Sequence, residues 1–255
     1  MKSFDWKAEA VPLDERREII VPGDARETID FCYRQFLQIG SDAITKRGAF
    51  AVALSGGSTP NAIFHELSKP NHNKALDWSK VLLFWSDERS VPSNDPDSNY
   101  HNAMHAGLSK LPLLPENIFR MHAEMDIENH ALAYEDSIRK KVPSLEFDLM
   151  MLGMGEDGHT ASLFPHTKGL KATDRLVIAN EVPQKKTWRM TMTFECINMA
   201  KVICVYVIGA NKASIATKVL SGAYDPENYP VQKVGTDTHK ALWILDREAS
   251  RLLLP

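Results

Sequence analysis

The sequence predicts an α/β fold: a Rossmann-like, doubly wound and mainly parallel sheet with helices on both faces. Apolar runs of strand length alternate along the chain with longer stretches that repeat apolar residues at helical spacing. Polar segments, several of them rich in glycine, follow these apolar runs. The sequence shows no internal repeat, low-complexity tract or Gly/Ser linker, so we expect residues 1–255 to form a single domain.

The helical pattern is clearest over 24–47, where apolar residues recur three or four positions apart and the pattern stops at Gly48. A second helix is expected to run to Leu67, with Thr59 as its N-cap and Pro60 at its first position. Further helices are predicted at 98–108, 127–141, 211–220 and 247–253.

The apolar runs predict strands at 49–54, 80–85, 117–121, 147–152, 187–194, 201–208 and 242–246. Segment 187–194 alternates strictly, with Trp188 and Met190 on one face and Arg189 on the other. Strands that alternate with helices form parallel sheets, and ligands bind beyond the carboxyl ends of such strands. The polar segments that follow the strands are therefore where we expect function.

Composition argues against several classes of partner. The formal net charge is −3, which favours neither nucleic acid nor an anionic membrane surface. The longest apolar stretches are of strand length, far short of the roughly 20 residues that a membrane helix needs, and the N-terminal segment resembles no secretion signal. Cys32, Cys196 and Cys204 have no metal-ligand spacing, which is typical of a reduced, cytoplasmic protein. The oligomeric state cannot be read from the sequence.

The first candidate site is a strand-to-helix turn with the sequence SGGSTP. Its glycines let backbone N–H groups approach an anion, its hydroxyls add donors, and the helix end adds partial positive charge. A P-loop is excluded because its spacing and its lysine are missing. The turn predicts a phosphate site or, alternatively, a tight turn that binds nothing; its residues are Ser55, Gly56, Gly57, Ser58 and Thr59.

Charged residues after other strands give the second group of candidates. Asp87 and Arg89 directly follow the strand at 80–85, where they form either a functional cluster or a self-satisfied surface cluster. Arg189 lies on the polar face of its strand, and Lys212 begins the helix at 211–220. Each cation alone could be an ordinary surface charge. Together with the SGGSTP turn, they would supply the local positive charge that a phosphorylated ligand needs.

Segment 153–159, GMGEDGH, allows two interpretations. It matches the G-x-G-x-x-G pattern of a dinucleotide-binding turn. However, Glu156 and Asp157 would place negative charge where the pyrophosphate sits, and Pro165 shortens any helix that follows. The favoured interpretation is a loop that carries His159 beside Asp157, a pair suited to acid–base chemistry. A solvent-facing or structural histidine is the alternative.

Taken together, these motifs resemble the 6-phosphogluconolactonase family, which is similar in fold to glucosamine-6-phosphate deaminase. The deaminase carries a glutamate at the position of Phe164 and a tyrosine at that of Arg89, so both positions here follow the lactonase pattern. The segments that carry the resemblance are ALSGGSTP (53–60), WSDERSVPSNDPDSNY (85–100), DLMMLGMGEDGHTASLFP (148–165), RMTMTF (189–194), GANKA (209–213) and WILDREA (243–249).

The resemblance implies hydrolysis of 6-phospho-D-glucono-1,5-lactone to 6-phospho-D-gluconate in the oxidative pentose phosphate pathway, without a metal or a cofactor. His159 would act as the base and Asp157 would orient it. Arg89 would stabilise the oxyanion or bind polar groups of the lactone, and Asp87 would hold a sugar hydroxyl or orient Arg89. The phosphate would bind the 55–59 turn with Arg189 and Lys212. The alternatives are a deaminase-like aldose–ketose isomerase and a non-catalytic sugar-phosphate sensor, although the sequence shows no basic helix-turn-helix segment.

Overall fold

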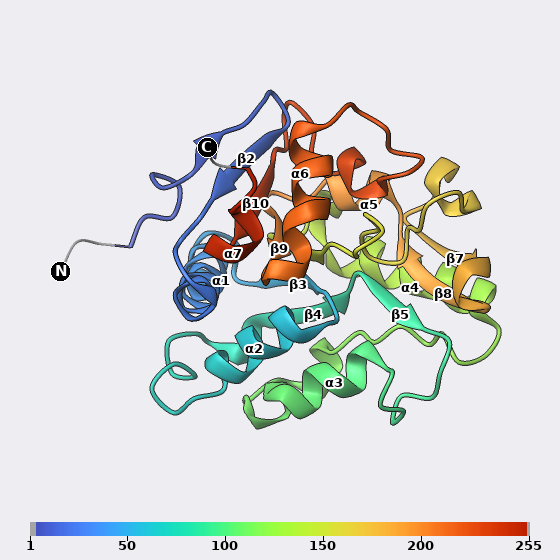
Figure 1. Ribbon diagram of the computed structural model, residues 1–255. Coiled ribbons are helices and arrows are strands. Elements are labelled where there is room, and N and C mark those ends of the chain that lie inside the picture. Colours follow the sequence, from blue (N-terminus) through green and yellow to red (C-terminus); the bar gives the residue numbers. More distant parts are fainter. Residues whose placement is uncertain (1–3, 254–255) are drawn as a thin grey trace.

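A computed structural model describes residues 4–253, and its main element is a seven-stranded sheet in the order β1-β2-β10-β9-β6-β3-β4 (Figure 1). The strands are β1 (Val11–Pro12), β2 (Arg17–Ile20), β10 (Ala241–Leu245), β9 (Ile203–Val207), β6 (Leu149–Gly153), β3 (Phe50–Leu54) and β4 (Val81–Trp85). Neighbouring strands pair in parallel except β1 with β2. The prediction of a mainly parallel sheet is confirmed.

Helices cover both faces of this sheet, with α2, α6 and α7 in front of it and α4 behind it in the view of Figure 1. Their bounds are α1 (Ala25–Arg47), α2 (Ser58–Leu67), α3 (Asn99–Ala106), α4 (Ile127–Lys141), α5 (Phe194–Asn198), α6 (Ala213–Ser221) and α7 (Arg247–Ser250). Strands β3, β9 and β10 are buried at every position, as expected of parallel strands covered on both faces.

The longest helix, α1, illustrates how sequence signals fix an element. Asp24 accepts a hydrogen bond from the backbone N–H of Glu27, whose side chain accepts in turn from the Asp24 N–H. This capping box starts the helix. Gly48 ends it in the left-handed conformation, with φ of 82°. The predicted bounds of 24–47 are therefore confirmed.

A second, three-stranded antiparallel sheet has the order β5-β8-β7. It consists of β5 (Asp87–Arg89), β8 (Thr187–Met192) and β7 (Val177–Val182). The predicted strand at 187–194 is thus real but lies in this smaller sheet. It ends at Met192 because Thr193 caps α5. Trp188 remains 41% exposed although Met190 and Met192 are buried, so only part of the predicted apolar face packs inside.

Three sequence predictions differ from the structure, and one of them is the helix predicted at 247–253, which ends at Ser250. Segment 117–121 is not a strand, because a 3₁₀ turn at Pro115–Asn117 leaves only one isolated bridge, between Ile118 and Leu83. Helix α2 begins at Ser58 rather than after Thr59. Its N-cap is Gly57, which has a φ of 107° and no side-chain cap. The glycine adopts a conformation that threonine rarely can.

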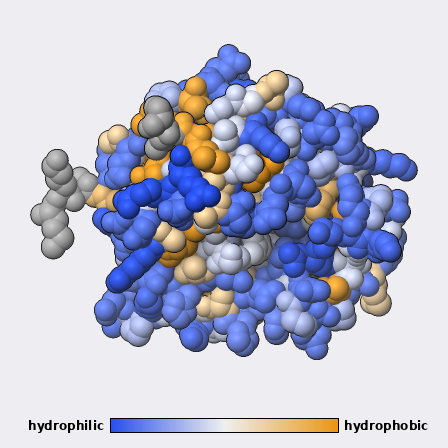
Figure 2. Space-filling model, in the orientation of Figure 1, coloured by the Kyte–Doolittle hydropathy of each residue, from blue (hydrophilic) through white to orange (hydrophobic). Residues whose placement is uncertain are grey.

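The face of the molecule in Figure 2 is mostly hydrophilic, with apolar side chains gathered near the position of β2 and α7 in Figure 1. Val11 and Leu252 are among the large apolar side chains that stay exposed. Among residues 4–253, no helix is long and apolar enough to cross a membrane.

Asp148 should contribute measurably to the stability of this sheet. Its buried carboxylate accepts hydrogen bonds from the backbone N–H of Ala51 and from Lys201 Nζ, each 3.0 Å away, and it also pairs with Arg47. Asp148→Ala leaves the Ala51 N–H buried without this acceptor, so we expect a loss of about 1–3 kcal/mol in the free energy of unfolding. Urea denaturation measures it. Asp42→Ala, on the exposed side of α1, is the control. An equal effect of both substitutions would contradict the role of Asp148.

Candidate active site

The carboxyl ends of four neighbouring strands, β4, β3, β6 and β9, lie along one edge of the main sheet. One candidate segment follows each of these strands: the SGGSTP turn after β3, Asp87 to Arg89 after β4, the histidine loop after β6, and Lys212 after β9. Parallel pairing therefore gathers residues that are far apart in the chain.

Two adjoining cavities open at this edge. The Ser55 cavity, of about 190 Å³, includes Ser55, Gly56 and Gly57 in its wall. The Arg189 cavity, of about 490 Å³, includes Arg189 and Phe164. The residues that line both cavities are Asp87, Arg89, Ala161 and His159. His159 thus stands where the two cavities meet.

His159 is paired with a carboxylate. Its Nδ1 lies 2.5 Å from Asp157 Oδ1, and its backbone N–H also donates to that oxygen. Burial alone would raise the pKa of the Asp157 carboxyl, but the hydrogen bonds and charge of His159 outweigh burial and hold this pKa below its ordinary value. An ionised carboxylate only accepts, so Nδ1 carries the hydrogen and Nε2 is the basic nitrogen of the neutral ring.

The glycines of the 153–159 segment shape the histidine loop. The N–H of Gly155 donates to the carbonyl of His159 at 2.9 Å, and Gly158, with φ of 77°, turns the chain back. A Cβ on Gly155 would lie 2.1 Å from His159 Nδ1. The loop then closes through a bridge between Thr160 and Leu163 instead of entering a helix. This geometry supports the acid–base interpretation and leaves no helix end at this loop for a pyrophosphate.

Phe164 stacks on the imidazole of His159, with ring centroids 4.0 Å apart and an interplanar angle of 19°. The phenylalanine is itself 4% exposed, so it forms a fixed apolar surface against one face of the histidine ring. Stacking and the Asp157 hydrogen bond together restrict the orientation of the ring.

Asp87 is buried, and both of its carboxylate oxygens have partners. Oδ2 accepts from Ser162 Oγ at 2.6 Å, and Oδ1 accepts from Asn99 Nδ2 at 3.2 Å. The Asn99 amide also packs against the SGGSTP turn, where a Cβ on Gly56 would fall 1.8 Å from its Oδ1. Asp87 is thus hydrogen-bonded to the segment after His159 and to α3, and through Asn99 it is linked to the SGGSTP turn.

Glu88, next in the chain, is buried and organises the start of α3. Its Oε1 accepts from the backbone N–H groups of Arg89 and Asn99, at 2.8 and 2.7 Å. Its Oε2 accepts from Ser98 Oγ and the N–H of Tyr100, each at 2.9 Å. Burial raises the pKa of the Glu88 carboxyl, although these four hydrogen bonds oppose the rise.

Arg89 and Arg189 lie directly opposite each other on β5 and β8. The Nε–H of each is buried and has no acceptor among the described residues. Burial and the charge of Arg89 lower the pKa of the Arg189 guanidinium, while Asp87, Glu88 and Asp97 act in the opposite direction. Unsatisfied cationic donors at the edge of a cavity are a natural site for an anionic or carbonyl oxygen.

Four predicted site residues lie outside the cavity walls, and one of them, Asp157, contacts the site through His159. Lys212 Nζ donates to the carbonyl of Met154 at 2.8 Å, and Met154 lines the Ser55 cavity, so the ammonium is beside that cavity. Ser58 and Thr59 form the first turn of α2, next to Gly57. The turn and Arg189 line different cavities, which meet at His159.

Sequence reasoning missed three residues of the cavity walls. Asn99 lines the Ser55 cavity, and Ser162 and Lys185 line the Arg189 cavity. Asn99 and Ser162 fall within the motifs 85–100 and 148–165, so their hydrogen bonds to Asp87 could have been suspected. Lys185 lies on the connection between β7 and β8, and nothing in the sequence marked it. Among residues 4–253, no group of three His, Cys, Asp or Glu side chains is placed to hold a metal ion.

Comparison of the sequence and comparison of the structure find the same kind of known proteins. A family model described as glucosamine-6-phosphate isomerases/6-phosphogluconolactonase matches residues 23–243. The chain is 39% identical to a 6-phosphogluconolactonase of Chlamydia pneumoniae, over 95% of this chain and 93% of the relative. It is 37% identical to one of Synechocystis, over 84% and 88% of the two chains.

Among solved structures, 6-phosphogluconolactonase from Thermotoga maritima matches with a TM-score of 0.75 and 27% identity, over 89% of this chain and 98% of that one. A monomeric glucosamine-6-phosphate deaminase matches with a TM-score of 0.77 over 92% and 99% of the two chains. At 20% identity, the second likeness shows a shared fold only.

The geometry of the histidine loop predicts that Gly155 is required. Gly155→Ala places a methyl group in the space of His159 Nδ1, so the ring must move and its bond to Asp157 should break. Imidazole ¹⁵N chemical shifts report this change. Gly153→Ala is the matched control, because a Cβ there meets nothing within 4 Å. An unchanged His159 signal in Gly155→Ala would show that the loop is looser than described.

Proposed function

Because the chain belongs to the glucosamine-6-phosphate isomerase/6-phosphogluconolactonase family, we propose that it hydrolyses 6-phospho-D-glucono-1,5-lactone to 6-phospho-D-gluconate in the oxidative pentose phosphate pathway. One observation of the site carries the proposal: His159, bound to Asp157 through Nδ1, stands at the junction of two cavities beside Arg89. A base next to a cationic donor is what the opening of a lactone by water requires.

In the proposed reaction, His159 Nε2 takes a proton from a water molecule, whose oxygen adds to the lactone carbonyl carbon. The negative charge of Asp157 stabilises the imidazolium that results. Arg89 donates to the oxyanion of the tetrahedral intermediate. The bond between the carbonyl carbon and the ring oxygen then breaks, and the imidazolium returns its proton to that oxygen. Asp87, held by Ser162 and Asn99, is proposed to bind a sugar hydroxyl or to orient Arg89.

We propose that the phosphate is held by the turn Ser55–Thr59 with Lys212 and Arg189. Ser55, Gly56 and Gly57 line the Ser55 cavity just before α2 begins, and the ammonium of Lys212 lies beside that cavity through its bond to Met154. Arg189 borders the adjoining cavity and brings an unsatisfied Nε–H. This set supplies the cationic donors that a dianionic phosphate needs.

Phe164 supports the lactonase over the deaminase. Deaminase chemistry implies a glutamate at this position for opening the sugar ring, and a buried phenylalanine stacked on the imidazole transfers no protons. We also propose that the enzyme works in the cytoplasm. Its cysteines, Cys32, Cys196 and Cys204, are free and buried, in keeping with a reducing compartment.

Removal of the proposed base gives the direct test. His159→Ala should lower kcat by about 10²–10⁴-fold, the usual worth of acid–base assistance. Lactone generated in situ from glucose 6-phosphate by its dehydrogenase is followed as it disappears, and the spontaneous rate is subtracted. His166→Ala, in the same loop but with an exposed side chain, is the matched control.

Lactone loss that is equally fast in wild type and His159→Ala would keep the reaction but remove His159 from it. If wild type does not accelerate lactone loss, the lactonase proposal fails and glucosamine 6-phosphate becomes the next substrate to try.

A further inference from the structure

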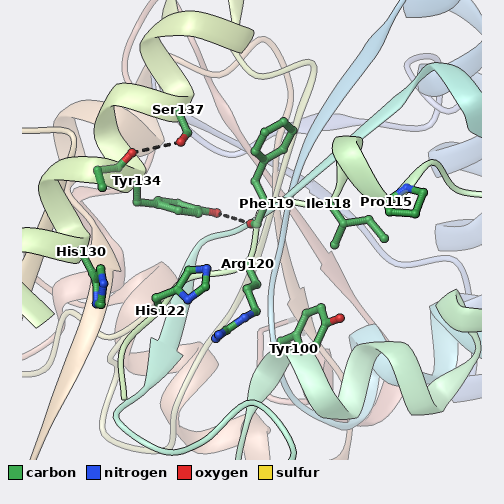
Figure 3. Close-up of a pocket in the computed structure, with 10 residues that line it drawn as sticks. Tyr100, Pro115, Ile118, Phe119, Arg120, His122, His130, Tyr134 and Ser137 are labelled. Carbon is green, nitrogen blue, oxygen red and sulfur yellow. Dashed lines mark hydrogen bonds between the residues drawn. The ribbon is translucent and has the colours of Figure 1, made fainter. Parts of the chain in front are cut away.

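A larger cavity, of about 590 Å³, lies at the β4 edge of the main sheet, and its lining, within residues 4–253, is separate from that of the two active-site cavities (Figure 3). One wall is the segment 118–122, which runs beside β4 through a 2.8 Å hydrogen bond from the N–H of Phe119 to the carbonyl of Leu83. The opposite wall is α4, and Tyr100 of α3 closes one end. We call this the edge cavity.

The edge cavity has a preformed aromatic lining. Phe119 stacks on the buried Phe84, with ring centroids 4.4 Å apart and an interplanar angle of 12°. The hydroxyl of Tyr134 donates to the carbonyl of Phe119 at 3.1 Å and accepts from the N–H of Trp85 at 2.7 Å. Packing and hydrogen bonds therefore hold these two rings in place. Such a lining suits a flat, apolar body.

Basic side chains gather in the same space. Figure 3 shows Arg120 and His122 projecting from one wall, with His130 beside them on α4. Both terminal nitrogens of Arg120 donate to Glu124, at 3.2 and 2.7 Å, which fixes the guanidinium but leaves three of its five N–H groups free of this pair. Lys141 Nζ lies 5.8 Å from the Phe119 ring centroid and adds positive charge nearby.

The two histidines offer further hydrogen-bonding groups. His130 Nδ1 donates to the carbonyl of Met125 at 2.7 Å, which leaves its Nε2 for another partner. The ring of His122 lies 5.6 Å from that of His130, centroid to centroid. Burial, and secondarily the charge of Arg120, lower the pKa of His122, so its neutral ring can accept as well as donate.

We propose that the edge cavity is a binding site for a small anion with a planar aromatic body, the chemistry shared by aryl phosphates and nucleoside phosphates. The body lies against Phe119 and the exposed edge of the largely buried Tyr134, and the anionic group accepts hydrogen bonds from Arg120 and the histidines. The volume is in the range of small-molecule sites, which combine apolar walls with a few convergent polar groups. A guanidinium held by a carboxylate is pre-oriented to receive an oxyanion.

The test fills the cavity without disturbing the active site. Ala133 lines the cavity from the exposed side of α4, so Ala133→Trp occupies the cavity at little cost to folding. Leu132→Trp is the matched control, since Leu132 is 48% exposed and lies outside the lining. Tyr100 is left intact because its ring packs against Trp85, two residues before Asp87 of the active site.

Phenyl phosphate is titrated by calorimetry into wild type and both variants, with unfolding midpoints measured to verify folding. We expect saturable binding to wild type and Leu132→Trp, and at least about tenfold weaker binding to Ala133→Trp, a difference of about 1.4 kcal/mol. Equal binding to all three proteins would place the probe elsewhere, and absent binding to wild type would also overturn the proposal.

Two further comparisons test the two halves of the ligand. Arg120→Gln should weaken phenyl phosphate binding, and unchanged affinity would remove the anion from the proposal. At the site that Ala133→Trp blocks, inorganic phosphate should bind wild type at least about tenfold more weakly than phenyl phosphate. Equal affinity for the two probes would show that the aromatic walls play no part.

Discussion

The parallel register of β4, β3, β6 and β9 is the constraint on which the site depends. Because neighbouring parallel strands end at the same edge, the residues that follow them meet in space although they span Ser55 to Lys212 in sequence. The strands are buried on both faces, so a shift in register would expose apolar side chains along much of the sheet. The position of the loops is therefore set by the core, and the chemistry is set by the loops.

The small antiparallel sheet brings two arginines together at this edge. It places Arg89 opposite Arg189, an arrangement of like charges that costs stability, and it leaves the Nε–H of each without an acceptor in the described part of the chain. Asp87 and Glu88 offset part of the charge, yet their oxygens are already engaged by Ser162 and by α3. An anionic ligand would satisfy what the protein alone does not, which is a common feature of sites built for substrate rather than for stability.

The fold was largely predictable because its signals are local. The capping residues of α1 and the apolar run of β3 each indicate the element they form from a few neighbouring residues. The short strands β1, β2 and β5 were not predictable. Two to four residues are too few to show a periodicity, and these segments become strands because of the strands they pair with. Segment 117–121 has the apolar content of a strand. However, it follows the turn that begins at Pro115, and it pairs with the edge strand β4 through one isolated bridge only.

The candidate site was predictable as a set of segments rather than as a geometry. The contact between Asp157 and His159 follows from their spacing, and Gly155 could be assigned to the histidine once the dinucleotide interpretation was rejected. The cross-strand pairing of Arg89 with Arg189 and the bond from Ser162 to Asp87 could not be predicted, because each joins distant parts of the chain through the second sheet. Asp87 and Arg89, which these contacts hold in place, line both cavities.

We propose that this edge unites an anion site with the His159 base, and substrate discrimination tests that union most directly. The measurement is kcat/KM for 6-phosphoglucono-1,5-lactone and for unphosphorylated glucono-1,5-lactone, in wild type, in Lys212→Ala and in the exposed control Lys218→Ala. Hydrogen bonds to charged groups are each worth about 1.5–3 kcal/mol, so wild type and Lys218→Ala should prefer the phosphorylated lactone by at least about a hundredfold. Lys212→Ala should reduce that preference, mainly by raising KM for the phosphorylated lactone. Equal kcat/KM for both lactones, or a preference that Lys212→Ala leaves intact, would contradict the account.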